Sequence, residues 1–183
     1  DLNKAFIHRN ITKKAFGVLK WAMSIDGRIA LKNGKSKWIT NDESRSLVHS
    51  FRAEFDAIII GGNTLRRDNP LLTTRGSKKP EPLRVVFTKS LDLPSKANLW
   101  DCSKAKTIVI YDSSTANESF LKRIPKCVEV EKVSSDNPEL ISKIPTSAPS
   151  ADRRLAISLP IPEPPPVITA RLDLSLWFDI VNN

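Results

Sequence analysis

Three features of the chain carry side chains that could bind a ligand. The first is Lys20, in an apolar run that ends in the turn Ser24-Ile-Asp-Gly27. The second is the apolar run 56–62, which is followed by the polar pair Asn63 and Thr64. The third is a scatter of cations that could pair with phosphate oxygens: Lys35, Lys37, Arg52, Arg66, Arg67 and Arg75. The chemistry these residue types suggest is the binding of phosphate and ribose oxygens.

Each feature also has a simpler explanation. Ser-Ile-Asp-Gly is an ordinary turn sequence. The pair Gly61-Gly62 falls far short of a complete dinucleotide-binding fingerprint. Most surface arginines are merely solvated. Patterns alone therefore indicate a basic α/β domain with a nucleotide or phosphate ligand, and nothing finer.

The elements that must position these residues alternate between strand and helix. Residues 16–23 predict a strand, with Lys20 on the face opposite Trp21. Thr40-Asn-Asp-Glu43 predicts a capping box, with Thr40 as N-cap of a helix that carries His49 and Arg52 on one of its faces. Residues 57–61 predict a central parallel strand, because the run is continuously apolar and bounded by glycine.

The same alternation continues downstream. Further strands are predicted at 83–87, 107–111 and 128–130, and short helices near 118–124 and after Pro138. This order predicts an α/β fold with a mostly parallel sheet and flanking helices. In such a sheet, ligands bind at the carboxyl ends of the strands, which here are the turns after residues 23 and 61.

Composition bounds the function classes. The chain of 183 residues suits one domain, and its net charge of +9 belongs wholly to the first 140 residues, so we expect anionic partners. No apolar run approaches the roughly 18 residues of a membrane span.

Cys102 and Cys127 have no metal-type or redox-type spacing, so we expect two buried or half-buried thiols and no metal site. The chain begins at Asp1, and we interpret it as a fragment or a processed product.

The character of the chain changes near Leu140. Seven of the thirteen prolines lie in 141–183, which predicts a disordered or poorly packed tail with at most one short apolar element at 172–181.

The ordered motifs resemble a known family. They are the blocks 19–30 (LKWAMSIDGRIA), 34–40 (GKSKWIT), 52–53 (RA), 61–75 (GGNTLRRDNPLLTTR) and 82–87 (PLRVVF). In this order and spacing they resemble the reductase domain of the bifunctional deaminase–reductase of riboflavin biosynthesis. Residues 1–15, with LNKAFIHR at 2–9, are similar to the linker from an upstream deaminase domain, and 98–101 (NLWD) is similar to plant and cyanobacterial members.

The resemblance implies a dihydrofolate-reductase-like fold and a reaction. The family reduces 5-amino-6-(5-phosphoribosylamino)uracil to the ribityl compound with hydride from NADPH. It implies cofactor-binding roles for Ala22, Trp38, Thr64, Asp68, Thr88 and Ser90. It implies substrate-binding roles for Ser36, Arg52, Leu72 and Arg75. Lys20 faces the same crevice, and we expect it to act as the catalytic residue that polarises the opened sugar.

The resemblance also sets expectations about partners and location. It implies a phosphorylated pyrimidine as the ligand rather than a nucleic acid or a membrane, with a homodimer formed through the reductase domain. It implies a soluble protein, in the plastid of a plant or otherwise in the cytoplasm.

The chain departs from the family pattern after Leu140. Members continue into a strand that ends in a Glu-Gly-Gly loop, whereas no glycine follows Gly76 here. We therefore expect a partial reductase domain at 16–140, incomplete at its C-terminus. The main alternative is a catalytically inactive product of such a gene. A folate-type reductase and a basic nucleic-acid-binding module are disfavoured, because blocks 34–38 and 68–75 match the riboflavin branch and aromatic residues do not interleave with the cations.

Overall fold

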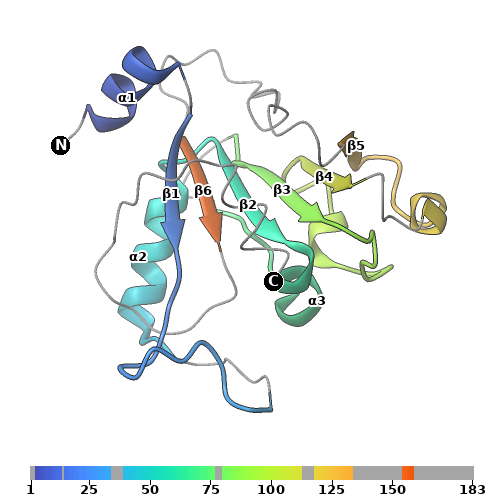
Figure 1. The fold of residues 1–183 in the computed structure, drawn as a ribbon, viewed down its shortest axis with the longest axis horizontal. Helices are drawn as coiled ribbons and strands as arrows, with labels where there is room; N and C mark the ends of the chain where they lie inside the picture. The colour runs from blue at the N-terminus through green and yellow to red at the C-terminus, as the bar shows by residue number, and fades with distance from the viewer. Residues whose placement is uncertain are drawn as a thin grey trace.

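A parallel sheet organises the chain. The computed structural model describes residues 3–13, 15–33, 39–76, 80–112 and 118–133, and the backbone of 154–158. Within these residues the sheet has six strands: β1 (Phe16–Lys20), β2 (Ala57–Gly61), β3 (Leu83–Thr88), β4 (Thr107–Asp112), β5 (Glu129–Val133) and β6 (Arg154–Ser158). Their order is β1-β6-β2-β3-β4-β5, and every pairing is parallel (Figure 1). The predicted α/β fold with a parallel sheet is confirmed.

The helices connect and flank these strands. They are α1 (Lys4–Thr12), α2 (Asp42–Arg52), α3 (Gly62–Asp68) and the 3-10 turns η1 (Asn98–Trp100) and η2 (Glu118–Lys122). The predicted cap of α2 is wrong by one residue. Asn41 is the N-cap, and its side chain accepts a hydrogen bond of 2.9 Å from the Ser44 amide. Asn41 outcompetes Thr40 because its carbonyl oxygen reaches the third residue of the helix from an extended backbone. The helix expected after Pro138 lies outside the described residues.

Strand β1 ends earlier than the sequence predicts, at Lys20 instead of Met23. The following turn closes on itself: the Gly27 amide donates to the Ser24 carbonyl (2.8 Å), and Gly27 has a φ of 77°. The Ser24 amide also donates to the Arg28 carbonyl (2.9 Å). Glycine is needed here because other residues rarely adopt this φ.

The core lies on both faces of the sheet. Alternate residues of β2, β3 and β4 pack into two clusters, which is the period-two geometry of a sheet covered on both sides. Ile58, Ile60 and Val86 belong to one cluster, and Ile59 and Val85 belong to the other. All of β2 is buried, as predicted for a central strand.

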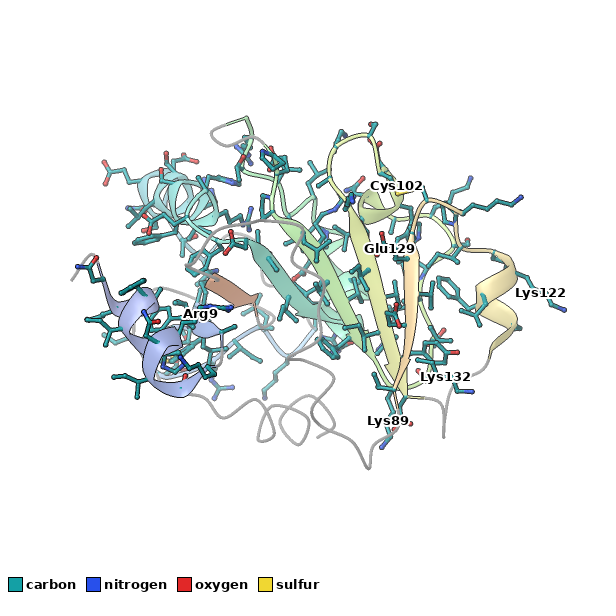
Figure 2. The ribbon with its side chains drawn as sticks, turned by 90° about the horizontal axis from the view of Figure 1, so that it is seen from above. Arg9, Lys89, Cys102, Lys122, Glu129 and Lys132 are labelled. Carbon is teal, nitrogen blue, oxygen red and sulfur yellow. A yellow bond between two sulfur atoms is a disulfide. The ribbon has the colours of Figure 1, made fainter. Side chains whose placement is uncertain are left out.

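The two edge strands are β1 and β5. Figure 1 shows them at opposite ends of the sheet, and Figure 2 shows Arg9 of α1 on the side away from Glu129 and Lys132 of β5. Glu129, Glu131 and Lys132 are exposed. Charges along an edge strand discourage pairing with other chains. Among the described residues, no helix has both the length and the apolar character to cross a membrane.

A buried arginine, which the sequence did not flag, ties the loop before β4 to β3. Arg84 is fully buried, and its guanidinium donates to the carbonyls of Leu99 (2.9 Å), Asp101 (3.0 Å) and Ala105 (2.6 Å). Burial lowers the pKa of Arg84, while the carboxylates of Asp101 and Glu81 oppose that shift. Carbonyl dipoles replace the lost water, so this cation has a structural role.

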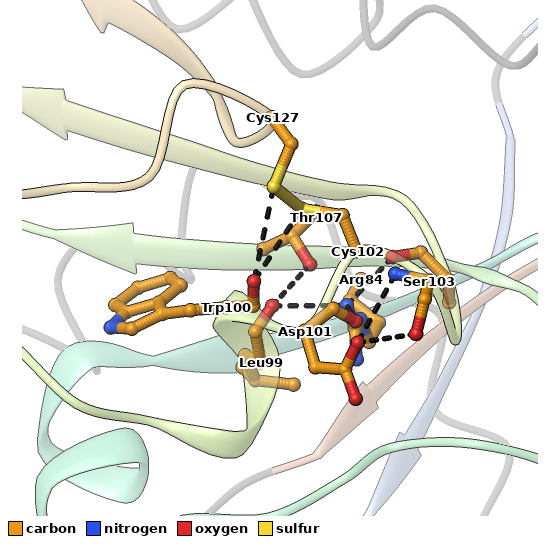
Figure 3. The surroundings of a disulfide bond; sticks show 9 residues. Arg84, Leu99, Trp100, Asp101, Cys102, Ser103, Thr107 and Cys127 are labelled. Carbon is orange, nitrogen blue, oxygen red and sulfur yellow. Dashed lines mark hydrogen bonds between the residues drawn. A yellow bond between two sulfur atoms is a disulfide. The ribbon is translucent and has the colours of Figure 1, made fainter.

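The cysteines form a disulfide, so the expectation of two separate thiols is wrong. Cys102 and Cys127 are bonded with their Cα atoms 6.3 Å apart (Figure 3). Cys102 precedes β4, and Cys127 precedes β5. The amino ends of neighbouring parallel strands meet at one sheet edge, which brings together two cysteines that are 25 residues apart in sequence. The spacing of the two cysteines in the sequence does not predict this disulfide.

Strand β6 contradicts part of the expected disorder in the tail. Residues 154–158 lie between β1 and β2 and pair with both, Phe16 to Lys20 against Arg154 to Ser158 and Ala57 to Ile60 against Leu155 to Ser158. The physical reason is that β1 and β2 do not pair with each other, so their backbone groups need a strand between them. The apolar element expected at 172–181 lies outside the described residues.

A proline in β6 tests this position. We expect Ala156→Pro to lower the melting temperature strongly, because a central strand hydrogen-bonds on both sides and proline removes a donor. Lys4→Pro is the matched control, since Lys4 is the first residue of α1, where proline is tolerated. Equal thermal unfolding of the two variants would contradict a paired β6.

Loss of the disulfide should cost stability. We expect the Cys102→Ser/Cys127→Ser variant to lose about 3 kcal/mol of unfolding free energy, as for a bridge closing a loop of this length. Urea unfolding with and without a dithiol reductant measures it, and the reductant should affect only the wild type. Two free thiols in the oxidised wild type, counted by alkylation and mass spectrometry, would refute the bridge.

Candidate functional site

The candidate site lies at the carboxyl ends of β1, β2 and β3. Lys20 is the last residue of β1 and is in register, through Ser158 of β6, with Ile60 of β2. Helix α3 starts directly after β2, and Thr88 ends β3. Figure 1 shows the arrows of β1, β6, β2 and β3 pointing to one side, with α3 at the arrowhead of β2. The sheet therefore collects residues from three sequence segments at one edge.

The charges of Arg52 and Asp68 both affect the pKa of Lys20. Burial, and then the positive charge of Arg52, lower its pKa, the negative charge of Asp68 partly opposes them, and the net pKa is about 8. Arg52 is the last residue of α2, and Asp68 is the last residue of α3. The three side chains thus interact although they come from a strand and two helices.

Arg52 adjoins a further cation. Its pKa is lowered by burial and then by the positive charge of Arg75. Arg75 is exposed and has a φ of 56°. Lys20, Arg52 and Arg75 therefore form a cationic cluster with one carboxylate, Asp68, at its side. Such a cluster suits a phosphate group, which accepts several charge-assisted hydrogen bonds and relieves the repulsion among the cations.

A tight turn forms the other half of the site. A Cβ on Gly62 would lie 3.1 Å from Thr88 Oγ1 and 3.2 Å from Leu93 Cδ2, so a larger residue would require these side chains to shift by a few tenths of an ångström, and glycine allows the close approach of α3 to β3. Thr64 is 4% exposed, and its Oγ1 has no hydrogen-bond partner in the described structure. Ala22 is 1% exposed. An unpartnered buried hydroxyl costs free energy, so its presence fits a polar ligand such as a nucleotide cofactor.

The segment before Arg75 is anchored by a carboxylate that sequence reasoning missed. Thr74 is fully buried; its amide donates to Glu81 Oε2 (2.6 Å) and its hydroxyl donates to Glu81 Oε1 (2.9 Å). Leu72 is 3% exposed with a φ of 54°. Two consecutive contacts from one carboxylate hold this unusual backbone and so position Arg75. A glutamate in a Pro-Glu-Pro sequence gave no signal of that role.

The structure groups most, but not all, of the residues predicted for the site. Those connected by charge or by their place at the strand ends are Lys20, Arg52, Thr64, Asp68, Arg75 and Thr88, whereas Ala22 and Leu72 are buried. Ser90 lies two residues beyond β3, exposed, and its Oγ accepts from the Asp92 amide (3.4 Å). Ser36 and Trp38 lie outside the described residues. The ligand roles of all these residues stay predictions.

His49 was missed as a site residue. It lies one turn before Arg52 on α2, with its Nδ1 3.2 Å from the Arg52 Nη1. The spacing of three residues on a helix was the available signal, because it puts both side chains on one face. In the described part of the chain, no group of three or more His, Cys, Asp or Glu side chains could hold a metal ion.

The fold and the site define a parallel α/β domain that gathers cations beside the tight turn between β2 and α3. The chain belongs to the RibD C-terminal domain family, whose sequence profile matches residues 15–144. Riboflavin biosynthesis protein RibD of Synechocystis is 48% identical over 130 residues, 71% of this chain and 35% of that protein. Riboflavin biosynthesis protein PYRR, chloroplastic, of Arabidopsis thaliana is 46% identical over 138 residues, 75% of this chain and 23% of that protein.

Solved structures agree with this membership. A diaminohydroxyphosphoribosylaminopyrimidine deaminase/5-amino-6-(5-phosphoribosylamino)uracil reductase from Thermotoga maritima has a TM-score of 0.66 at 30% identity, over 84% of this chain and 42% of that chain. RibD of Acinetobacter baumannii, at 24% identity and a TM-score of 0.66, shares the fold. The resemblance to the riboflavin reductase domain is confirmed. The chain spans about a third of the length of the Synechocystis relative and about a quarter of the Arabidopsis relative.

The depressed pKa of Lys20 can be measured directly. Because the neutral amine is the nucleophile, we expect acylation of Lys20 to rise with a midpoint near pH 8, against about 10.4 for an ordinary lysine. Arg52→Gln removes a positive neighbour and should move the midpoint up, and Asp68→Asn removes a negative one and should move it down. Peptide mass spectrometry after pulse labelling reports each midpoint, with the exposed Lys106 as the control for reagent access. A midpoint that ignores both substitutions would contradict the cluster.

Proposed function

We propose that this chain is the NADPH-dependent reductase of riboflavin biosynthesis, acting on 5-amino-6-(5-phosphoribosylamino)uracil. The observation that carries the proposal is the convergence of Lys20, Arg52, Arg75 and Asp68 beside the turn after β2. Family membership supports it, as does the Thermotoga maritima relative described as a reductase of this compound. The proposal includes a plastid location for a plant source and a cytoplasmic one otherwise, a homodimer, and no nucleic-acid partner; the chloroplastic Arabidopsis relative supports the first.

The cofactor is assigned to the tight-turn side. Ala22, Thr64, Asp68 and Thr88 lie there, and Trp38 and Ser90 complete the proposed set. The bound nicotinamide would supply the hydride. The residues of the chain do the rest: the Thr64 hydroxyl gains the partner that it lacks, and Gly62 keeps the turn close to β3. The small Ala22 leaves room beside the end of β1 for a flat ring.

The substrate phosphate is assigned to Arg52 and Arg75, with Leu72 packing nearby and Ser36 as a further hydrogen-bond partner. A phosphate between two guanidiniums removes their mutual repulsion, which already lowers the pKa of Arg52. The phosphate lies away from the sugar carbon that receives hydride, so the binding energy gained there serves to align the sugar.

Lys20 is the proposed catalytic residue. Its pKa of about 8 means that it holds a proton near neutral pH but gives it up readily. That proton can be donated to the opened sugar beside the carbon that receives hydride. The negative charge of Asp68 raises the pKa of Lys20 and so favours the protonated amine. Burial and Arg52 lower this pKa and so favour release of the proton.

Turnover of this compound tests the proposal. We expect the full chain to oxidise NADPH when the substrate is added. Lys20→Met should lower kcat about 100-fold or more, as for loss of a general acid. Arg52→Gln should raise KM about 10- to 100-fold, the cost of a charge-assisted hydrogen bond. Lys106→Gln, an exposed change at the opposite sheet edge, is the control and should behave as wild type.

The outcomes distinguish the proposed reductase from an inactive product and from a folate-type reductase. A folded wild type without turnover would contradict the proposal and favour the inactive-product alternative. Turnover of dihydrofolate in preference to the phosphoribosyl compound would instead favour a folate-type reductase. Unchanged kcat in Lys20→Met would remove only the role of the lysine.

A further inference from the structure

His49 contacts Arg52 and the segment that carries Arg75, although no chemistry above uses it. Its Nδ1 lies 3.2 Å from Arg52 Nη1. A guanidinium has donors only, so Nδ1 must accept this hydrogen bond and the ring proton must be on Nε2. The bond therefore fixes the tautomer of a neutral His49 as well as the direction of the Arg52 side chain.

The same ring contacts the segment that carries Arg75. His49 makes a hydrogen bond with the Thr73 backbone that raises its pKa, as donation from a ring N–H to a carbonyl does. With Nδ1 occupied by Arg52, the donor is Nε2–H. One imidazole therefore joins the last turn of α2 to the residues just before Arg75.

The charges around His49 explain why a neutral ring is suited to this position. Burial is the largest cause lowering its pKa, and the positive charges of Arg52, from its own helix, and Arg75, from the facing segment, lower it further. Two cations held close together repel each other, and an acceptor between them reduces that cost without adding charge. A lysine or a protonated imidazole would add to the repulsion.

The facing segment is held on its other side as well. Thr74 is fixed to Glu81 by two hydrogen bonds, of 2.6 and 2.9 Å. Thr73 is thus anchored to α2, and Thr74 is anchored to Glu81, two residues before β3. Arg75 follows directly and is exposed, so its guanidinium reaches solvent beside the partly buried Arg52.

We propose that His49 is a positioning residue that holds Arg52 and the Thr73–Arg75 segment at the separation at which both guanidiniums bind one phosphate monoester. The inference rests on the proposed function, because that phosphate is taken to be the one on the ribose of the substrate. His49 does not touch the reacting atoms, so its effect reaches the substrate only through the arginines.

The test compares His49→Ala with His49→Gln and with Ser50→Ala, an exposed neighbour whose hydroxyl bonds within α2 (3.3 Å to the Ser46 carbonyl). Gln keeps one acceptor and one donor on a planar amide. Steady-state kinetics with NADPH gives kcat and KM. Calorimetry with ribose 5-phosphate and with unphosphorylated ribose gives phosphate recognition without turnover, and thermal unfolding reports the fold.

We expect His49→Ala to raise KM and the Kd of ribose 5-phosphate about tenfold, with kcat changed less than about twofold. Binding of ribose should not change. His49→Gln should recover most of the loss, and Ser50→Ala should match wild type. A defect that is only structural would weaken ribose and ribose 5-phosphate equally and would lower the melting temperature in proportion.

Each remaining outcome decides the inference. Unchanged KM and Kd in His49→Ala, or equal weakening for ribose and its phosphate, overturns it. If His49→Ala does not fold, the comparison moves to His49→Gln, and a folded Gln variant with tenfold weaker phosphate binding overturns the two-contact role. A wild type that lacks turnover but binds ribose 5-phosphate in a His49-dependent way refutes the proposed function and leaves the inference standing. A wild type that neither turns over nor binds ribose 5-phosphate overturns both.

Discussion

The separation of β1 from β2 by one strand is the constraint on which the site depends. Lys20 ends β1, whereas the turn with Gly62 and Thr64 follows β2, and β6 alone pairs with both strands. Neighbouring strands lie about 4.8 Å apart, so one intervening strand sets β1 and β2 about 10 Å apart. That distance leaves space at the strand ends for the side chains of Lys20, Arg52 and Asp68 to meet. If β1 paired directly with β2, Lys20 would press on the turn itself. Backbone pairing far along the sequence thus determines the electrostatics of residues near its beginning.

Two buried arginines have different roles in this domain: Arg84 stabilises the fold, and Arg52 lies where an anion can bind. Arg84 is fully buried, but main-chain carbonyls at 2.6 to 3.0 Å take the place of water, so it stabilises the loop before β4. Arg52 lies beside Arg75 and Lys20, and its hydrogen bond goes to a neutral imidazole. Concentrating like charges costs free energy in the folded protein, and the cost is recovered when an anion arrives. The first arrangement satisfies most of the guanidinium without a ligand, and leaves only the Arg84 Nε without a hydrogen-bond partner in the described structure; the second brings like charges together and so favours an anion.

The sequence predicted what local patterns determine. The continuous apolar run at β2 and the β-rich runs at β3 and β4 were recognisable because buried parallel strands need such residues along their whole length. Lys20, Arg52 and Arg75 were singled out by residue type and by resemblance, although their mutual contact was not derivable. The disulfide and the His49 contact with Thr73 join segments that are far apart in sequence, and the Thr74–Glu81 contact joins residues seven apart in one connecting segment. Such pairs leave no periodic signal. Strand β6 was missed because its sequence, RLAIS, is less apolar than β2 and lies in a proline-rich segment.

The position of β6 separates completion of the sheet from ligand binding at the strand ends. The family profile ends at residue 144, before β6, so the strand that completes the sheet lies outside the matched part of the chain. Strand pairing uses backbone groups, which every residue except proline supplies, so a sequence unlike that of the relatives can still occupy the position between β1 and β2. Binding at the carboxyl end of a strand depends on side chains and on glycines, which are specific. The chain supplies that chemistry itself on the sides of β1, β2 and β3, through Lys20, Thr64 and Thr88. Completion of the sheet by β6 therefore supports the fold through the backbone, whereas ligand binding depends on the side chains and glycines at the turns after β1, β2 and β3.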